Sequence, residues 1–161
     1  MKRKTLLSGV CVLLGLAFLF SLQVFSAEPT ESAEAKQLVA LVDKAAALVE
    51  SKGKDFFPEL RKRDSEWWKG DLYVFVDGMD GTVLVNPVDP GLEGKNLLKD
   101  PASKAVAELL IEKAKTKGSG WVEYMWPKPG ESTPSKKISY VKRIKMPDGV
   151  PVIIGAGMYA R

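Results

Sequence analysis

The chain has 161 residues, 45% of them apolar and 27% charged, which is ordinary for a globular protein with one core. It has no histidine and one cysteine, Cys11, which excludes imidazole metal sites, Ser-His or Cys-His catalysis and a disulfide framework. Three of the 24 basic residues precede residue 28 and all 20 acidic residues lie after residue 27, so the remainder carries 21 basic and 20 acidic residues, a net +1. This near-neutral balance gives no support for nucleic-acid binding.

Residues 1–27 are predicted to be a secretory signal peptide. Lys2-Arg3-Lys4 forms a basic head, residues 6–20 are almost wholly apolar, and the small Ser26-Ala27 pair closes the segment. The alternative is an uncleaved membrane anchor, because the apolar segment approaches the roughly 20 residues that a membrane span needs. In both cases we expect residues 28–161 to form a single exported domain.

The exported part begins with a helical pattern. Apolar residues such as Leu38, Val42, Ala45 and Val49 recur at three- and four-residue spacing, charged residues lie between them, and Gly53 ends the pattern. The spacing predicts an amphipathic helix that lays its apolar stripe on a sheet.

A second short helix is predicted from Pro58 to Trp68, because proline is tolerated in the first turn of a helix. Trp67 and Trp68 are adjacent, so their indoles cannot both point into one core.

Two strands joined by a tight turn follow. Residues 72–76 and 82–85 are rich in β-branched and aromatic side chains, and Asp77-Gly78-Met79-Asp80-Gly81 between them is typical of a hairpin turn. Residues 86–98 are interpreted as a loop that prolines and glycines make rigid. A rigid loop beside a sheet suits ligand binding.

The rest of the chain predicts one helix and three strands. Asp100 and Pro101 indicate a capped helix start, and Gly118 indicates the helix end. The strands are expected at residues 120–126, 137–145 and 150–159. In the last strand, Gly155 and Gly157 share a face and leave room for a close approach, for instance by an aromatic ring. The element order predicts an α+β fold with a five-stranded antiparallel sheet.

Four ordered blocks between Tyr73 and Tyr159 carry a family resemblance. They contain Tyr73-Val-Phe75 with Asp80-Gly81, Asn86-Pro87 and Gly94-Lys95-Asn96-Leu97; Gly118-Ser-Gly-Trp-Val122 with Tyr124-Met-Trp126-Pro-Lys-Pro-Gly130; Lys137-Ile-Ser-Tyr140-Val-Lys142; and Gly155-Ala-Gly-Met-Tyr159. They resemble extracytoplasmic single Cache domains of the second type, the PAS-like sensor modules of bacterial chemoreceptors and sensor kinases. The resemblance implies a PAS-like fold, a long N-terminal helix behind the sheet, a pocket on the other face, and a periplasmic or secreted location.

The same resemblance implies that the domain binds a short carboxylate, such as acetate, propionate, lactate or pyruvate, without transforming it. The pocket residues that it indicates are Tyr73, Phe75, Asn86, Trp126, Lys137 and Tyr140. Tyrosine hydroxyls, an amide, an indole N–H and an ammonium would together satisfy a buried carboxylate. Lys137 and Tyr140 alternate to opposite faces of a regular strand, so both line one pocket only if a bulge intervenes or if one of them lies past the start of the strand. The alternatives are aromatic packing for Tyr73, Phe75 and Tyr140, a solvated Lys137, and a turn-forming Asn86.

Two departures from the family are visible. Family members commonly carry histidine at the position of Asn86, and the chain ends at Arg161 directly after the last strand. We therefore expect a solo domain that acts through a separate membrane sensor kinase, chemoreceptor or transporter. A homodimer through the N-terminal helix is the further expectation, because related sensor domains often pair through this element.

Other functions fit the sequence less well. An enzyme would need a base or nucleophile beside Asp77, Asp80 or Asp89, and none is indicated, so no catalytic residue or cofactor is expected. A calcium loop starting at Asp77 fails because Met79 and Val88 occupy ligand positions. A structural or partner-binding module without a small ligand remains the alternative.

Overall fold

The computed structural model describes residues 29–160, so the predicted leader over residues 1–27 lies outside the described part. In chain order the elements are α1 (Ala33–Lys52), α2 (Phe57–Leu60), β1 (Trp68–Lys69), β2 (Leu72–Gly78), β3 (Val83–Val85), α3 (Lys104–Lys117), β4 (Ser119–Pro127), β5 (Pro134–Lys145) and β6 (Pro151–Tyr159). No helix within these residues is both long and apolar enough to traverse a bilayer.

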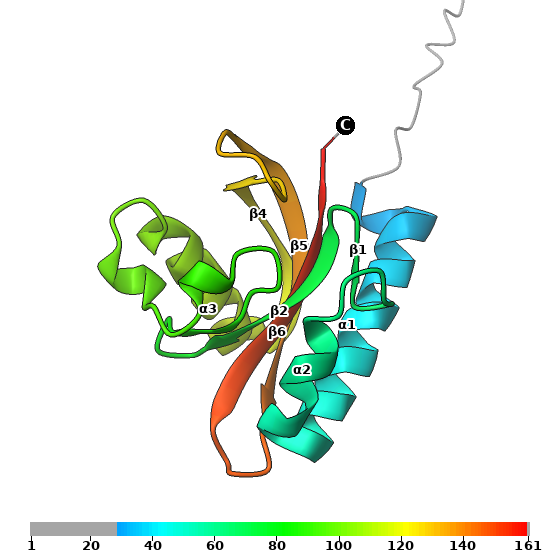
Figure 1. Ribbon diagram of the computed structural model, residues 1–161, viewed down its shortest axis with the longest axis vertical. Helices are drawn as coiled ribbons and strands as arrows, with labels where there is room; N and C mark the ends of the chain where they lie inside the picture. Colours follow the sequence, from blue (N-terminus) through cyan, green and yellow to red (C-terminus); the bar gives the residue numbers. More distant parts are fainter. Residues whose placement is uncertain (1–28, 161) are drawn as a thin grey trace, which may run out of the picture.

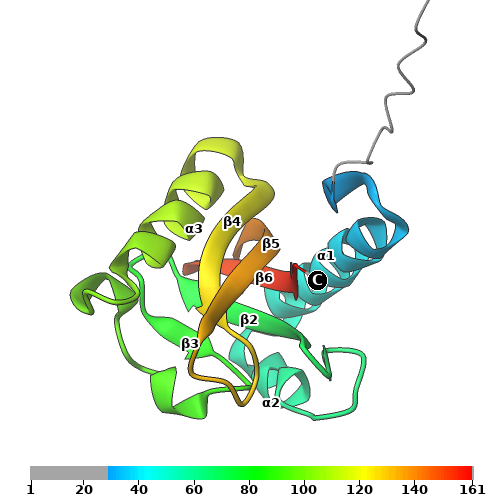
Figure 2. The ribbon, with the colours of Figure 1, turned by 90° about the horizontal axis from the view of Figure 1, so that it is seen from above.

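One antiparallel sheet separates the helices. Within residues 29–160 it has six strands in the order β1-β2-β6-β5-β4, with β3 paired to the far end of β2. The helix α1 runs along one face and α3 covers the other (Figure 1), and the view from above separates the three layers (Figure 2). The predicted α+β fold is confirmed, and the two-residue β1 is an addition to the expected strands.

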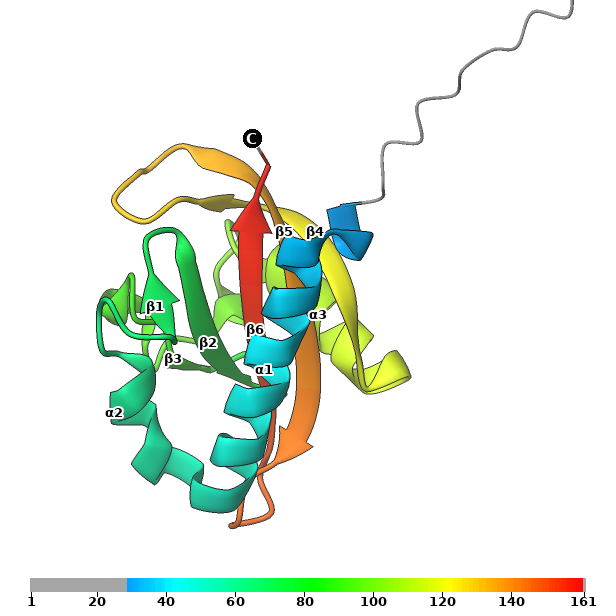
Figure 3. The ribbon, with the colours of Figure 1, turned by 90° about the vertical axis from the view of Figure 1, so that its right-hand side faces the viewer.

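The long helix α1 forms where the apolar spacing predicted it. Its N-cap Ser32 accepts a 3.0 Å hydrogen bond from the Ala35 N–H, and it ends at Gly53, whose φ of 59° favours glycine. Its buried stripe packs on the sheet residues that point the same way, including Val74 and Ile154. Figure 3 shows α1 lying along β6. The apolar burial of α1 therefore occupies one face of the sheet and leaves the other for α3.

The second predicted helix is wrong beyond its first turn. The helix α2 ends at Leu60, Asp64 adopts a positive φ of 58°, and Trp68 already belongs to β1. Trp67 packs edge-on against Phe56 at 5.3 Å in the core beneath α1, whereas Trp68 packs with the cluster on the α3 side. Adjacent residues point to opposite faces in an extended chain and not in a helix, so two neighbouring indoles with different destinations favour the strand.

The helix α3 begins later than predicted. Asp100 was expected as its N-cap, but α3 starts at Lys104, and the Asp100 carboxylate instead accepts hydrogen bonds from the Ala102 N–H at 3.2 Å and the Ser103 hydroxyl at 2.6 Å. These contacts close a separate turn before the helix. The predicted end at Gly118 is confirmed.

The central strand β2 divides its side chains strictly between the two faces. Val74 and Val76 join the core under α1, while Tyr73, Phe75 and Asp77 point to the α3 side. The strand continues to Gly78, two residues beyond the predicted end, so Asp77 lies in the strand and not in the turn. This extension places a carboxyl group on the same face as the two aromatic rings.

Gly155 in β6 makes room for one of these rings. It pairs directly with Phe75 across the strands, and an added Cβ would lie 2.3 Å from the Phe75 ring, far inside van der Waals contact. The predicted close approach of an aromatic ring to this glycine is confirmed.

We expect Gly155→Ala to lower the free energy of unfolding by about 1–3 kcal/mol, because the new methyl group overpacks a site whose neighbours are fully buried. Urea denaturation of the variant and the wild type measures this difference. Val150→Ala at an exposed turn position is the control and should change stability by no more than about 0.5 kcal/mol. An unchanged Gly155→Ala protein would contradict the packing described here.

Candidate functional site

A buried cavity lies on the α3 face of the sheet. Its lining comes from four strands of the sheet (β2, β3, β4 and β5), from the loop between β3 and α3, and from α3 itself. The lining residues are Tyr73, Phe75, Asp77, Val83, Asn86, Leu97, Val106, Leu110, Tyr124, Trp126 and Lys137. Polar groups on the sheet therefore face an apolar roof made by α3.

The free space in this cavity is small. Its volume, measured as the space open to the centre of a water molecule, is about 20 Å³. A single water needs roughly 10–15 Å³ by this measure. The cavity consequently admits one or two water molecules as it stands, and only the smallest organic ligands approach that size without displacing side chains.

Lys137 on β5 is the cation of the cavity. Its side chain is 1% exposed, and its Nζ lies 3.8 Å from the centroid of the Tyr73 ring, 5.1 Å from that of Tyr159 and 5.7 Å from that of Phe75. Three aromatic rings around one ammonium supply cation–π attraction. Among residues 29–160, these rings are the contacts of the ammonium, and no acceptor forms a hydrogen bond or ion pair with it. An ammonium without such an acceptor is poised to receive an anion.

Gly157 in β6 allows the lysine stem to lie flat on the sheet. An added Cβ at this position would lie 2.6 Å from Lys137 Cε. Burial lowers the pKa of Lys137 to about 7, and the negative charge of Asp77 opposes this shift.

Asp77 on β2 is the anionic counterpart, and it was missed as a site residue because it was assigned to the hairpin turn. Its side chain is buried and lines the same cavity as Lys137. Burial raises the pKa of Asp77 to about 7, with the Lys137 charge acting in the opposite direction. The period-two pattern that predicts Tyr73 and Phe75 on one face extends to Asp77, so the signal was present in the sequence.

Tyrosine hydroxyls complete the polar lining. The Tyr124 hydroxyl lies 2.8 Å from Ser139 Oγ in a fully buried pair, and Tyr73, which is 1% exposed, lines the same cavity. Burial raises the pKa of Tyr73 and of Tyr124 well above the ordinary tyrosine value. Both hydroxyls are therefore neutral at physiological pH and can donate hydrogen bonds.

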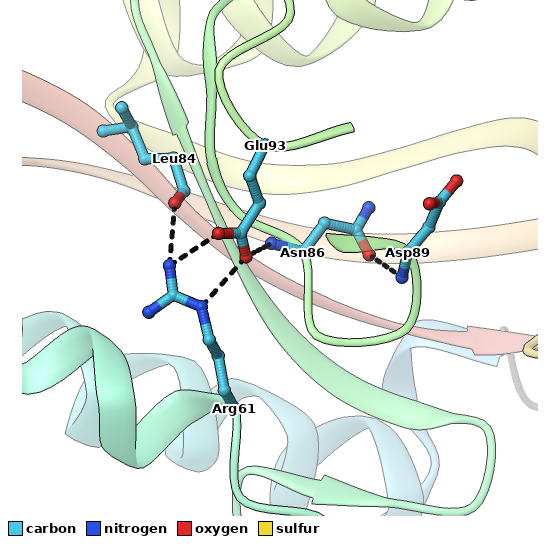
Figure 4. Close-up of polar contacts among 5 residues, drawn as sticks. All are labelled: Arg61, Leu84, Asn86, Asp89 and Glu93. Atoms are coloured by element: carbon cyan, nitrogen blue, oxygen red, sulfur yellow. Dashed lines mark hydrogen bonds and ion pairs between the residues drawn. The ribbon is translucent and has the colours of Figure 1, made fainter. Parts of the chain in front are cut away.

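The loop that carries Asn86 is fastened across the edge of the sheet (Figure 4). Arg61, just after α2, donates to Glu93 through Nε at 3.0 Å and Nη2 at 2.7 Å, and Nη2 also reaches the Leu84 carbonyl at 3.3 Å. Glu93 in turn accepts from the Asn86 backbone N–H at 3.0 Å. Partial burial pushes the pKa of Glu93 upward, but the hydrogen bonds from Arg61 and Asn86 outweigh it and hold the pKa below its usual value.

The Asn86 side chain itself combines two tasks. Its Oδ1 accepts a 3.1 Å hydrogen bond from the Asp89 N–H, as the turn-forming alternative proposed. Asn86 is buried and lines the cavity. Within the described residues, no acceptor is bonded to its amide nitrogen. The oxygen is thus committed to the turn, which leaves the NH₂ group as the part available to a ligand.

Tyr140 does not line the cavity, and its predicted placement there is corrected. It lies on the α1 face of the sheet, where its ring packs against Trp121 at 5.4 Å. The register of β5 with both β4 and β6 runs without a shift from Lys137 through Tyr140. Because no bulge intervenes, a separation of three residues sends the two side chains to opposite faces.

The structure brings the other five predicted residues together. Tyr73, Phe75, Asn86, Trp126 and Lys137 all line the one cavity, and their part in ligand binding stays a prediction. Tyr159, whose ring lies beside the Lys137 ammonium, and Tyr124 were missed along with Asp77. Strand alternation from Trp126 and from Gly157 would have indicated Tyr124 and Tyr159 respectively.

The architecture defines a PAS-like α+β domain with a buried polar cavity on one face of its sheet. A family model described as a Cache domain matches residues 61–161, and the chain therefore belongs to the Cache domain family. The resemblance noted in the sequence is confirmed by this match.

The chain is similar to a chemotaxis protein and to two solved sensor domains. The methyl-accepting chemotaxis protein McpP of Pseudomonas putida is 35% identical over 91 residues, a match that covers 55% of this chain and 16% of that protein. A solved structure described as a periplasmic sensor domain of a chemotaxis protein is 27% identical, with a TM-score of 0.59 over 78% of this chain and 90% of its own. A Cache chemosensory domain whose structure was described for carboxylic acid recognition is 28% identical, with a TM-score of 0.64 over 80% of this chain and 95% of its own.

We expect Lys137→Met to stabilise the ligand-free protein by roughly 1–4 kcal/mol at pH 6, since an apolar side chain of similar length replaces a buried charge. Asp77 carries its proton at this pH and is not left as an unpaired anion. Because the pKa of Lys137 is about 7 in the folded protein and 10.5 in a free lysine, the cost of burying its charge is fully present below pH 7. That cost declines between pH 7 and 10.5, so the advantage of the variant should shrink over this range.

Thermal unfolding of both proteins at pH 6, 8 and 10 measures this difference. Lys136→Met, at an exposed position on the same strand, is the matched control. A Lys137→Met protein that is less stable than the wild type at pH 6 would show that the ammonium is satisfied in the ligand-free protein.

Proposed function

We propose that this protein is an extracytoplasmic sensor or binding domain for a short carboxylate, which it captures without transforming. The observation that carries the proposal is the Lys137 ammonium, which is 1% exposed, faces a small cavity and has no acidic partner bonded to it among residues 29–160. A buried charge is costly unless something pairs with it. A ligand carboxylate would supply that pair.

The remaining polar groups can supply hydrogen bonds to the carboxylate oxygens of such a ligand. The hydroxyl of Tyr73, the NH₂ of Asn86 and the indole of Trp126 lie around the same space and can donate to carboxylate oxygens. Phe75 and Leu110 offer apolar surface to a short carbon chain. The similarity to a Cache domain described for carboxylic acid recognition supports the same ligand class here.

The volume of the cavity predicts which of the four short carboxylates fits best. With about 20 Å³ open, acetate should fit best, and propionate, lactate and pyruvate should require side chains to move apart. Trp126 is the side chain placed to move, because it lines both the cavity and a surface hollow of about 480 Å³ beside the β4–β5 loop. Figure 3 shows this loop arching away from the end of the sheet. Trp126 thus forms the wall between the ligand space and solvent.

The biological setting follows from the leader and the family. We infer export through residues 1–27, a periplasmic location, and signalling through a separate membrane protein such as a chemoreceptor, sensor kinase or transporter. The similarity to periplasmic sensor domains supports the location. The similarity to a chemotaxis protein supports the signalling role.

We expect the protein to bind acetate or propionate saturably and without turnover, and Lys137→Met to weaken that binding by about 10- to 100-fold, the effect of losing one hydrogen bond to a charged group. Isothermal titration calorimetry at pH 6 measures the affinities, and nuclear magnetic resonance of the recovered acid detects any turnover. Lys136→Met should bind like the wild type, because its ammonium is exposed and pairs with Glu123. No binding of any of the four acids would favour the alternative of a structural module, and turnover would favour an enzyme.

A further inference from the structure

One buried ionisable group is not used by the proposed binding mode. Asp77 is 8% exposed, lies on the same face of β2 as Tyr73 and Phe75, and lines the same cavity as Lys137, with which it forms no ion pair. Within residues 29–160, no donor hydrogen-bonds to its carboxyl oxygens. A carboxylate in this position would repel a carboxylate ligand held in the same small space.

The other groups around Asp77 do not remove this conflict. Tyr124 lies beside it on β4 and Lys137 on β5, while the residues that α3 contributes are apolar, namely Val106, Ala107, Leu110 and Ile111. Among these groups, only Asp77 and Lys137 are able to change charge near neutral pH, since burial raises the pKa of Tyr124 far above that range. Tyr73 and Tyr159, which lie beside Lys137, also have raised pKa values, and the more distant Asp71 acts on Lys137 through its charge alone.

We propose that Asp77 is a ligand-contacting residue which takes up a proton as the anion enters, so that the protein captures a short carboxylate together with protons from solution. The protonated carboxyl then donates a hydrogen bond to one carboxylate oxygen while Lys137 pairs with the ligand charge. This inference rests on the proposed function and adds the pH dependence of the same site.

The proton count follows from the charges that the bound state requires. The occupied cavity holds two protons on this pair, one on the Asp77 carboxyl and one on the Lys137 ammonium. The empty cavity at pH 7 holds about one, because both groups have a pKa of about 7, and at pH 8.5 it holds close to none. Binding therefore takes up about one proton near neutrality and approaches two in alkaline solution.

The affinity should reflect this uptake directly. The logarithm of the association constant falls with pH by the number of protons taken up, so two protons correspond to about 100-fold per pH unit and one proton to about tenfold. In Asp77→Asn the amide replaces the protonated carboxyl as a permanent donor of the same size, and only Lys137 can still titrate. The pH dependence of the variant is then limited to one proton.

The experiment titrates sodium acetate and sodium propionate into protein expressed from its full coding sequence. Calorimetry at pH 6, 7, 8 and 8.5, in two buffers of different ionisation enthalpy at each pH, counts the protons directly. We expect no net uptake at pH 6, more than one proton in the wild type at pH 8.5, and at most one in Asp77→Asn. Asp80→Asn is the matched control, because this carboxylate lies in the exposed turn of the same hairpin, where it binds Thr82, and its proton count should equal that of the wild type.

The outcomes are distinct. If the wild type takes up one proton or less at pH 8.5, the inference is overturned without any variant. If the wild type and Asp77→Asn take up the same number of protons, and that number exceeds one, the inference is also overturned. In both cases carboxylate binding itself stands. Failure of the wild type to bind either acid at pH 6 overturns the proposed function and this inference together. Circular dichroism verifies that Asp77→Asn is folded, and the wild-type count decides the inference if it is not.

Discussion

The cavity is organised around a lysine ammonium that is buried without a counter-ion bonded to it. Three aromatic rings lie around the Lys137 ammonium, and Asp77, which lines the same cavity, forms no ion pair with it. Much of the neighbouring sequence accommodates this one group: the glycine in β6 that clears space for its stem, and the tyrosines that surround its head. A fold optimised for stability alone would place a leucine or methionine there.

The sheet can hold such a group because one of its faces is packed with apolar side chains and the other carries the polar groups. The face under α1 is packed with valine, isoleucine and alanine, and it gains the apolar burial on which folding relies. The opposite face carries hydroxyl, carboxyl and ammonium groups under an apolar roof from α3. Because strand side chains alternate, each of β2, β4, β5 and β6 contributes to both functions without interrupting its hydrogen bonds.

Local pattern predicted most of the fold and part of the site. The α1 stripe, the hairpin and the last three strands were predicted correctly from periodicity and turn residues. The residues that the family resemblance indicated at the cavity include Tyr73, Phe75, Asn86, Trp126 and Lys137, which line it, and their part in ligand binding stays a prediction. The errors share one cause. Asp77 was interpreted as a turn residue, Trp67 and Trp68 as the end of a helix, and Tyr140 as a cavity residue, and in each case the deciding fact was how far a strand extends and in which register.

The contacts that hold the loop beside the cavity were the hardest to predict. The hydrogen bonds between Arg61 and Glu93 join segments that lie far apart along the chain, and no spacing rule connects these two residues. Such pairings appear only when the chain is folded, since they depend on how the loop after β3 passes the end of α2.

That tie has a mechanical consequence. The Glu93 carboxylate accepts hydrogen bonds from Arg61 and from the backbone N–H of Asn86. The loop beside the cavity and the end of the short helix α2 are therefore bonded to the same carboxylate. A displacement of Asn86 would therefore act on the hydrogen bonds of Glu93 and, through Arg61, on the end of α2. Since α2 packs in the core under α1, this carboxylate couples the loop at the cavity to the opposite face of the sheet.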